Sequence, residues 1–373
     1  MSKTSRTAIL ILAALLFVNC AAAFPVTVTD YYGENITINE KPQRIISLMP
    51  SNTEILFAVG AGDQVVGVTD HCNYPAEAQN VTKIGGYVTL DAEKIVDLKP
   101  DLVLAYEANG EEAISYLKKL GLTVVTLDST TMEDIENNIQ LVGSITGHDE
   151  EAKTIVSDMQ SRTEKILGQT KDMDNSNRPR VLFIVSFDPM YAAGNGSFPD
   201  NLITIAGGSN IVEADAWPTV SLEDVVQQNP QIIICTGMGE KGIKFRQQIL
   251  NSTVLSVTDA VQNQKVYAIL EPNIIERPGP RVIEGLEQIY SFISPELQLI
   301  SFPASENVTD VEDITDEKNI ADTEKLNAAP ASENTTQSNP SSPQEATPKT
   351  PGFGIGLAAC MVISTCIIKA SKK

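Results

Sequence analysis

Two glutamates, Glu93 and Glu223, occupy matching positions in a stretch of sequence that occurs twice. Each lies seven residues before a proline, Pro100 or Pro230, and an apolar run follows each proline. Because proline cannot continue a helix, each copy predicts a short helix, then a turn, then a strand, with the glutamate early in the helix. A carboxylate in the first helical turn stabilises the helix dipole. Two equivalent carboxylates could also make a paired ionic contact with a partner.

Residues suited to catalysis or metal binding are scarce. The chain has two histidines, His71 and His148, so we expect neither a zinc enzyme nor a histidine-rich metal trap. No glycine-rich phosphate loop, nucleophile elbow or cluster of metal ligands occurs in the sequence. We therefore predict a protein that is not an enzyme and holds no metal or cofactor. The formal charge of −21 argues against a nucleic-acid partner, which requires clustered Lys and Arg.

The cysteines do not form a disulfide framework. Cys20, Cys360 and Cys366 lie in apolar terminal segments, which leaves Cys72 and Cys235 in the body of the chain. Because a disulfide between those two would lock together the halves that carry the two repeat copies, we expect two free thiols.

A long amphipathic helix pattern separates the two copies. It runs from Asp149 to about Leu167, with apolar residues mostly three or four apart. We interpret it as a rigid helix that joins two lobes with a cleft between them; the alternative is an ordinary core helix in one large domain. Apolar strands alternate with helices in both halves, which favours an α/β architecture with mainly parallel sheets.

Two shorter signals lie near the start of the body. Val26–Thr29 and Ile36–Ile38 alternate in polarity around Gly33, which predicts a β-hairpin. The tetrapeptide Ser51-Asn52-Thr53-Glu54 fits a capping box that opens a helix.

The two ends of the chain differ in composition from its body. A basic start, an apolar run and small residues at 20–23 indicate a secretory signal, and the polar stretch after about Pro303 cannot bury enough surface to fold. We divide the chain into a signal peptide (1–23), a first lobe (24–148), an interlobe helix (149–171), a second lobe (172–298), a disordered acidic Ser/Thr/Pro stalk (299–350) and a C-terminal sorting or membrane segment (351–373).

Six Asn-x-Ser/Thr sites occur in this secreted chain, which predicts glycosylation of some of them. They are Asn35, Asn80, Asn195, Asn251, Asn307 and Asn334.

Several segments together resemble the substrate-binding proteins of ABC importers for cobalamin, siderophores and haem. They are residues 44–62, residues 67–75, the two repeat copies, and Glu276-Arg277 with Pro280-Arg281. The resemblance covers about residues 26–295 and is greatest to the cobalamin binders. It implies two Rossmann-like lobes joined by one long α-helix, a ligand held in the cleft between them, and little motion on binding.

The resemblance also implies the ligand-contacting residues. Five positions match the cleft aromatics of the family: His71, Tyr87, Tyr106, Tyr191 and Trp217. The segment from Asn273 to Arg277 matches a further wall of the cleft. Rings at these places suit a large, flat, conjugated ligand. His71 could stack on the ligand, coordinate its metal or remain a polar loop residue, and core packing is the alternative for each tyrosine. Several positions carry His or Tyr where the cobalamin binders have Tyr or Trp, which leaves the particular corrinoid open.

By the same resemblance, Glu93 and Glu223 dock on arginines of an ABC permease dimer that works with its ATPase. We expect a monomer that captures a corrinoid, cobalamin above all, and delivers it to that permease. The alternatives are an iron chelate, either a siderophore or haem, and, from another class, a stalked cell-surface adhesin.

The C-terminus resembles an archaeal surface-sorting signal. Pro351-Gly352-Phe353 precedes an apolar run and a basic end. This implies cutting by an archaeosortase-like processing enzyme and anchoring on the extracellular face of the cytoplasmic membrane. The alternative is an uncut C-terminal membrane anchor, and the mass of the mature protein distinguishes the two.

Overall fold

The computed structural model describes residues 24–237 and 241–294. The expected signal peptide (1–23), stalk (299–350) and C-terminal segment (351–373) therefore lie outside the described residues, as do Asn307 and Asn334. Within the described part of the chain, no helix is long and apolar enough to cross a membrane.

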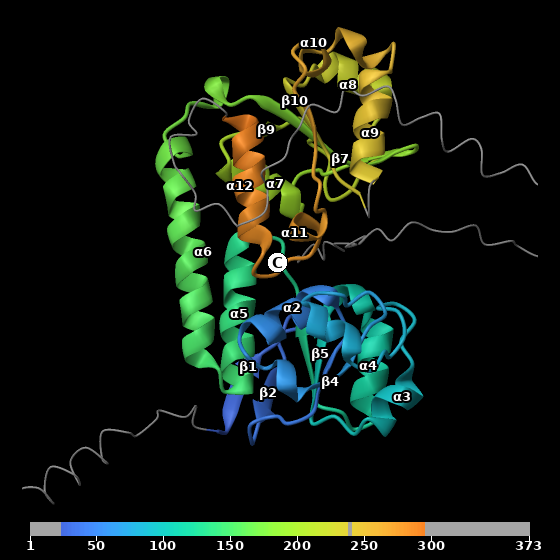
Figure 1. The fold of residues 1–373 in the computed structure, drawn as a ribbon, viewed down its shortest axis with the longest axis vertical. Helices are drawn as coiled ribbons and strands as arrows, with labels where there is room; N and C mark the ends of the chain where they lie inside the picture. The colour runs from blue at the N-terminus through green and yellow to red at the C-terminus, as the bar shows by residue number, and fades with distance from the viewer. Residues whose placement is uncertain (1–23, 238–240, 295–373) are drawn as a thin grey trace, which may run out of the picture. The chain divides into compact units, whose positions relative to one another are not determined.

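The first lobe is built on a parallel sheet of four short strands, in the order β4-β3-β5-β6 (Figure 1). Every residue of β3, β5 and β6 is buried, as expected for a parallel sheet covered on both faces. Its strands are β3 (Ile45–Ser47), β4 (Val65–Val68), β5 (Leu102–Tyr106) and β6 (Val124–Leu127). Its helices are α2 (Pro50–Ala58), α3 (Ala92–Asp97), α4 (Glu111–Lys119) and α5 (Met132–Thr146).

The second lobe has a five-stranded sheet in which only β8 runs antiparallel, to β7. Its strands are β7 (Arg180–Phe187), β8 (Met190–Ala192), β9 (Ser209–Asn210), β10 (Ile232–Cys235) and β11 (Val266–Ala268). Its helices are α7 (Phe198–Ile205), α8 (Leu222–Gln228), α9 (Lys241–Leu250), α10 (Asp259–Gln262), α11 (Asn273–Glu276) and α12 (Val282–Ile293). The predicted α/β architecture with mainly parallel sheets is confirmed.

The duplicated stretch forms the same unit in both lobes, α3–β5 and α8–β10. Each helix starts at a polar N-cap, since Asp91 accepts a hydrogen bond from the Lys94 amide and Ser221 from the Asp224 amide. Each unit turns through a left-handed residue before its proline, with φ of 48° at Lys99 and 46° at Asn229. Both strands then enter the interior of their sheets, and the predicted helix–turn–strand order is confirmed.

The N-terminal hairpin is also confirmed. Strands β1 (Val26–Thr29) and β2 (Asn35–Ile38) pair antiparallel. Gly33 in the connecting turn has φ of 78°, a conformation in which a Cβ would be strained.

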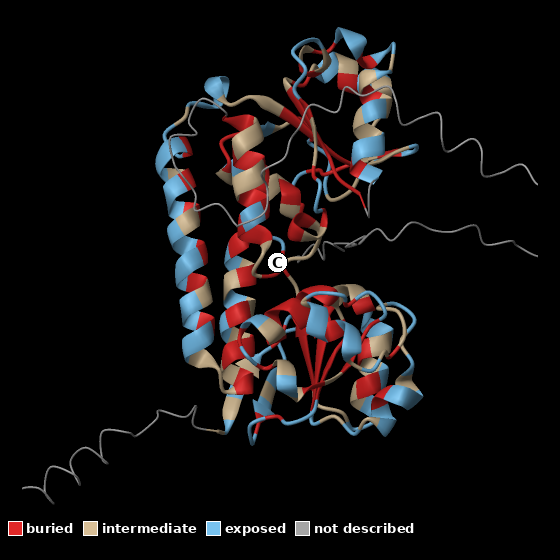
Figure 2. Cartoon of the chain, viewed as in Figure 1, coloured by how far each residue is buried: buried red, intermediate tan, exposed pale blue. Residues whose placement is uncertain are grey.

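The helix between the two copies, α6, spans Asp149–Thr170 and is three residues longer than its apolar pattern indicated. It runs alongside α5 and α12 (Figure 1), and its buried stripe faces them while its outer face is exposed (Figure 2). Arg162 makes a bidentate ion pair with Glu287 of α12, at 2.7 and 2.6 Å. The Thr170 hydroxyl donates to the Ile205 carbonyl at the end of α7, at 2.8 Å. The helix is therefore fixed to second-lobe elements along its C-terminal half.

The predicted capping box at Ser51 is wrong. Helix α2 starts two residues earlier than that box requires, at Pro50, with Met49 as an N-cap that makes no side-chain bond. Proline fits the first helical position because its φ is already helical and its missing N–H is not needed there. Ser51 and Glu54 are consequently inside the helix and buried, at 1% and 3% exposure.

Close packing of α5 on α6 gives a stability prediction. A Cβ built on Gly143 of α5 would lie 2.4 Å from the Ala152 Cβ, whereas one on Gly168 of α6 would meet nothing within 4 Å. Gly143→Ala should therefore destabilise the protein by about 1–3 kcal/mol through overpacking. Gly168→Ala, the matched control, should stabilise it by roughly 0.5–1 kcal/mol. Urea unfolding of both variants measures this, and changes of the same sign would contradict the packing argument.

Candidate functional site

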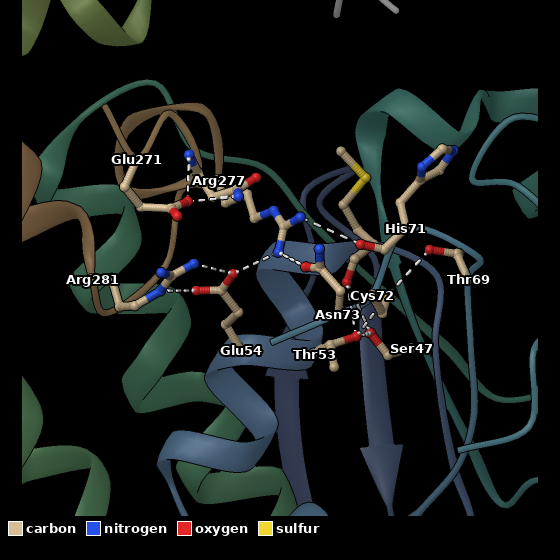
Figure 3. Close-up of polar contacts among 12 residues, drawn as sticks. Ser47, Thr53, Glu54, Thr69, His71, Cys72, Asn73, Glu271, Arg277 and Arg281 are labelled. Atoms are coloured by element: carbon tan, nitrogen blue, oxygen red, sulfur yellow. Dashed lines mark hydrogen bonds and ion pairs between the residues drawn. The ribbon is translucent and has the colours of Figure 1, made fainter. Parts of the chain in front are cut away.

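A buried carboxylate from the first lobe is shared by two arginines from the second. Arg281 binds both oxygens of Glu54, with Nε 2.8 Å from Oε2 and an Nη 2.9 Å from Oε1 (Figure 3). Arg277 donates to the same Oε1 at 3.0 Å. Glu54 is on α2, Arg277 follows α11 and Arg281 precedes α12. We call these three residues the Glu54 cluster. Its fork-like geometry is that of strong charge-assisted hydrogen bonds.

The cluster continues onto the surface of the first lobe. The Arg281 guanidinium lies over the Tyr74 ring, 3.8 Å from its centroid, which is a cation–π arrangement. A concavity of about 390 Å³ adjoins this pair. It is lined by Glu54, Phe57, Ala58, Tyr74, Pro75, Glu77, Pro280 and Arg281.

His71 lies in a loop of residues 69–75, which follows β4 and which we call the His71 loop. Its backbone is anchored below by the buried Cys72, whose sulfur lies 3.1 Å from the hydroxyl oxygens of both Thr53 and Thr69. The Lys83 ammonium donates to the Cys72 carbonyl at 2.8 Å. His71 itself is exposed.

Arg277 reaches the His71 loop directly. It donates to the Asn73 side-chain oxygen at 2.8 Å and to the His71 carbonyl at 3.4 Å (Figure 3). The expected wall residue Arg277 therefore contacts first-lobe groups rather than its neighbours Glu276 or Glu271. Asn273, at the start of α11, is half-buried and bonds the Glu271 carboxylate at 2.6 Å.

The remaining first-lobe candidates differ in exposure. Tyr87 is half-buried, and its ring makes an edge-on contact with His71 at 5.8 Å between centroids. Tyr106, at the end of β5, is only 4% exposed, and its hydroxyl donates to the Ser129 carbonyl at 3.4 Å. Burial raises the pKa of Tyr106 above its usual value. The structure thus pairs His71 with Tyr87, while Tyr106 has little surface free for a ligand.

The second-lobe aromatics come from adjacent segments. Tyr191 of β8 bridges Thr219, and the Ala192 amide donates to the Pro218 carbonyl at 3.1 Å. Trp217 precedes that proline, and both Tyr191 and Trp217 are half-buried.

The candidates share a position relative to the sheets. The His71 loop follows β4, Tyr106 ends β5, and Asn273 lies beyond β11. These are the carboxyl ends of parallel strands, the side on which α/β sheets bind their ligands.

Four residues of this site are absent from the set of ligand-contacting residues expected from sequence: Glu54, Asn73, Tyr74 and Arg281. Asn73 belongs to a loop that the sequence indicates only by composition. Glu54 left no usable signal in the sequence, because its position next to Ile55-Leu56-Phe57 does not fix which side of the helix it faces.

Residues 45–272 match the model of the periplasmic binding protein family. The chain belongs to that family. An uncharacterized ABC transporter substrate-binding lipoprotein of Bacillus subtilis is 35% identical over 280 residues, covering 73% of this chain and 87% of that protein. The vitamin B12-binding protein of Vibrio cholerae is 31% identical over 257 residues, covering 67% and 89%. The crystal structure of the periplasmic vitamin B12 binding protein of Vibrio cholerae superposes with a TM-score of 0.60 at 28% identity, covering 69% of this chain and 99% of that one.

Family membership settles the class of activity. This periplasmic binding protein is a substrate-binding protein of the kind that serves ABC importers, and it is not an enzyme. It acts outside the cytoplasm.

The two glutamates of the repeat have the same local setting in this binding protein. Glu93 and Glu223 are each the second residue of their helix, two positions after the N-cap, and both are exposed. Among the described residues, no side-chain hydrogen bond or ion pair joins Glu93 or Glu223 to the Glu54 cluster or the His71 loop.

The asparagines of the Asn-x-Ser/Thr sites are exposed wherever the structure describes them: Asn35, Asn80, Asn195 and Asn251. The Asn195 amide donates to the Asp215 carboxylate at 3.0 Å, and Ser197 of the same site is buried. The Asn35 side-chain oxygen likewise accepts a hydrogen bond from the Thr29 hydroxyl, at 2.9 Å.

The thiols of the body are both free and buried in the structure. Burial raises the pKa of Cys235, in β10, to about 12. This thiol therefore stays protonated and unreactive at neutral pH.

A pH prediction follows from Glu276, whose carboxylate accepts a hydrogen bond from the Thr236 hydroxyl at 3.0 Å. Burial raises the pKa of Glu276. The folded state therefore binds this proton more tightly than the unfolded state, and stability falls as pH rises from about 4.3 through the raised pKa. Glu276→Gln should flatten that part of the stability–pH curve.

The measurement is urea unfolding of wild type and variant at a series of pH values. Glu40→Gln, which changes an exposed glutamate, is the control and should keep the wild-type slope. An unchanged slope in Glu276→Gln would show that this carboxyl does not cause the fall in stability with rising pH.

Proposed function

We propose that this substrate-binding protein captures a corrinoid, cobalamin above all, between its two lobes and delivers it to the permease of an ABC importer. The observation that carries the proposal is the position of ring side chains at the ligand-binding edges of both lobes. His71 and Tyr87 form one pair, and Tyr191 and Trp217 lie on adjacent segments of the other lobe. The similarity to the vitamin B12-binding protein of Vibrio cholerae, in sequence and in structure, supports the same ligand.

Ring side chains suit a corrin for a physical reason. They present large apolar area at low cost in conformational entropy, and their OH and NH groups reach the amide substituents at the edge of a flat macrocycle. The His71 imidazole and Trp217 indole each offer such an edge.

The charges near the site also favour a corrinoid over an iron chelate. A strongly anionic ferric siderophore would require unpaired cations. Both arginines of the site, Arg277 and Arg281, are engaged with Glu54. This pairing supports a guest with little net negative charge.

The ligand is tested by titrating purified protein with cyanocobalamin, hemin and a ferric siderophore, using calorimetry and fluorescence. Trp217 is the only tryptophan of the chain, so its emission reports the second-lobe side of the site. Cyanocobalamin should bind, and Trp217→Ala should weaken binding by about tenfold or more, since each tenfold is roughly 1.4 kcal/mol. Tyr116→Ala, an exposed aromatic of α4, is the control and should bind normally. If hemin or the siderophore binds and cyanocobalamin does not, the ligand is an iron chelate and the corrinoid assignment is wrong. If none of the three binds, the result favours the alternative of a cell-surface adhesin.

We further propose that Glu93 and Glu223 are the contacts to the two permease subunits. Equivalent charges, one on each lobe, match a partner built of two like subunits. Exchanging both for Ala should abolish uptake in cells that carry the transporter while leaving ligand affinity unchanged. The loss of helix-dipole stabilisation should cost only about 0.3–1 kcal/mol at each position.

A matched control separates docking from the helix dipole. Glu112 and Glu133 are also exposed glutamates in first turns, of α4 and α5. The double Ala variant at these two positions should import normally. Uptake that survives loss of Glu93 and Glu223, or fails equally in the control, would refute the docking assignment.

A further inference from the structure

The His71 loop is held in place from two directions, and one of them is the other lobe. On the first-lobe side, Cys72 contacts the hydroxyls of Thr53 and Thr69 beneath the loop. On the second-lobe side, Arg277 donates to the Asn73 side chain at 2.8 Å and to the His71 carbonyl at 3.4 Å. Arg281 also lies over the Tyr74 ring, 3.8 Å from its centroid, but no hydrogen bond joins that ring to Arg281. His71, Asn73 and Tyr74 are otherwise exposed.

Arg277 can act on the loop because its own position is fixed. Glu54, whose side chain is 2% exposed, accepts from Arg277 at 3.0 Å. Arg281 in turn holds both oxygens of Glu54. The carboxylate therefore cannot rotate without breaking a bidentate pair, and it keeps the Arg277 guanidinium pointed at the loop.

We propose that Arg277 is a positioning residue for the His71 loop, with Asn73 as its contact on the loop and Glu54 as its orienting partner. Through these bonds the second lobe sets the conformation of a ligand-contacting loop of the first. His71 is thereby held in place for its contact with Tyr87. The link to ligand binding rests on the proposed function; the ordering of the loop does not.

The mechanism is suppression of local opening. A surface loop with few buried apolar contacts opens independently of the rest of the protein unless specific bonds close it. Hydrogen bonds from a charged donor are about twice as strong as those between neutral groups. The Arg277–Asn73 bond is therefore a large part of what closes this loop from above.

The chain contains its own reporter of loop opening. Cys72 is the buried residue of the loop itself, at 1% exposure, so a thiol reagent reaches it only when the loop opens. Cys235, at 0% exposure in the central strand β10, becomes accessible only when the second lobe unfolds. The ratio of the two labelling rates separates local opening from global loss of structure.

The experiment labels ligand-free, full-length protein with a maleimide and measures the modification of each cysteine-containing peptide by mass spectrometry. Asn73→Ala removes the loop contact and leaves the Glu54 ion pairs intact, and Arg277→Gln removes both bonds to the loop. In both variants, labelling of Cys72 should accelerate about tenfold, with Cys235 unchanged. Asn177→Ala, an exposed asparagine of the second lobe, is the control and should label as wild type.

Two results overturn the proposal. Wild-type labelling of Cys72 in both variants would show that Arg277 does not hold the loop. Equal acceleration at Cys72 and Cys235 would show that the variants loosen the whole protein and that the role is structural only.

A parallel titration with cyanocobalamin separates this proposal from the proposed function. Asn73→Ala should weaken cyanocobalamin binding by about tenfold, and Asn177→Ala should not. If wild type binds no cyanocobalamin but Cys72 still opens in Asn73→Ala, the positioning role stands and the corrinoid assignment fails. If wild type binds and Cys72 stays protected in the variants, the corrinoid assignment stands and the positioning role fails.

Discussion

One buried carboxylate connects the two lobes of this protein. The Glu54 carboxylate is buried on α2 and loses its hydration. Two guanidinium groups from the second lobe replace the lost water and offset the cost of burying the charge. Removing one partner of such a buried set leaves an uncompensated charge, at a cost of about 3–5 kcal/mol. The start of α12, the end of α11 and the His71 loop are all held by this interaction. These three second- and first-lobe segments therefore depend on a single side chain.

The parts of the fold that sequence predicted are those determined by local signals. A polar N-cap, a proline and an apolar run specify α3–β5 and α8–β10 wherever they occur, and a repeating apolar stripe specifies α6. The role of Glu54 could not be read in this way. The same spacing of Ser51 and Glu54 serves a capping box or a buried pair, and its partner Arg277 lies 223 residues away. A proline at the first helical position decided between them.

Sequence also places a residue more reliably than it orients its side chain. The apolar run after Pro100 predicts a strand, and the structure extends β5 to Tyr106, but the run does not say whether the Tyr106 ring turns toward solvent or toward Ser129. Whether a ring at such an edge is free for a guest or packed away depends on neighbours from other parts of the chain. His71 and Tyr87 illustrate the opposite case, because two loops separated along the chain bring their rings together at the surface.

The recurrence of one helix–turn–strand unit in both lobes has a consequence for recognition. Glu93 and Glu223 each follow a side-chain N-cap, Asp91 or Ser221, occupy the same helical position and precede a left-handed turn. If the two glutamates dock on like permease subunits, as proposed, the binding protein has two docking orientations related by a half-turn. Any preference between the two orientations must come from parts of the lobes that the duplication does not share.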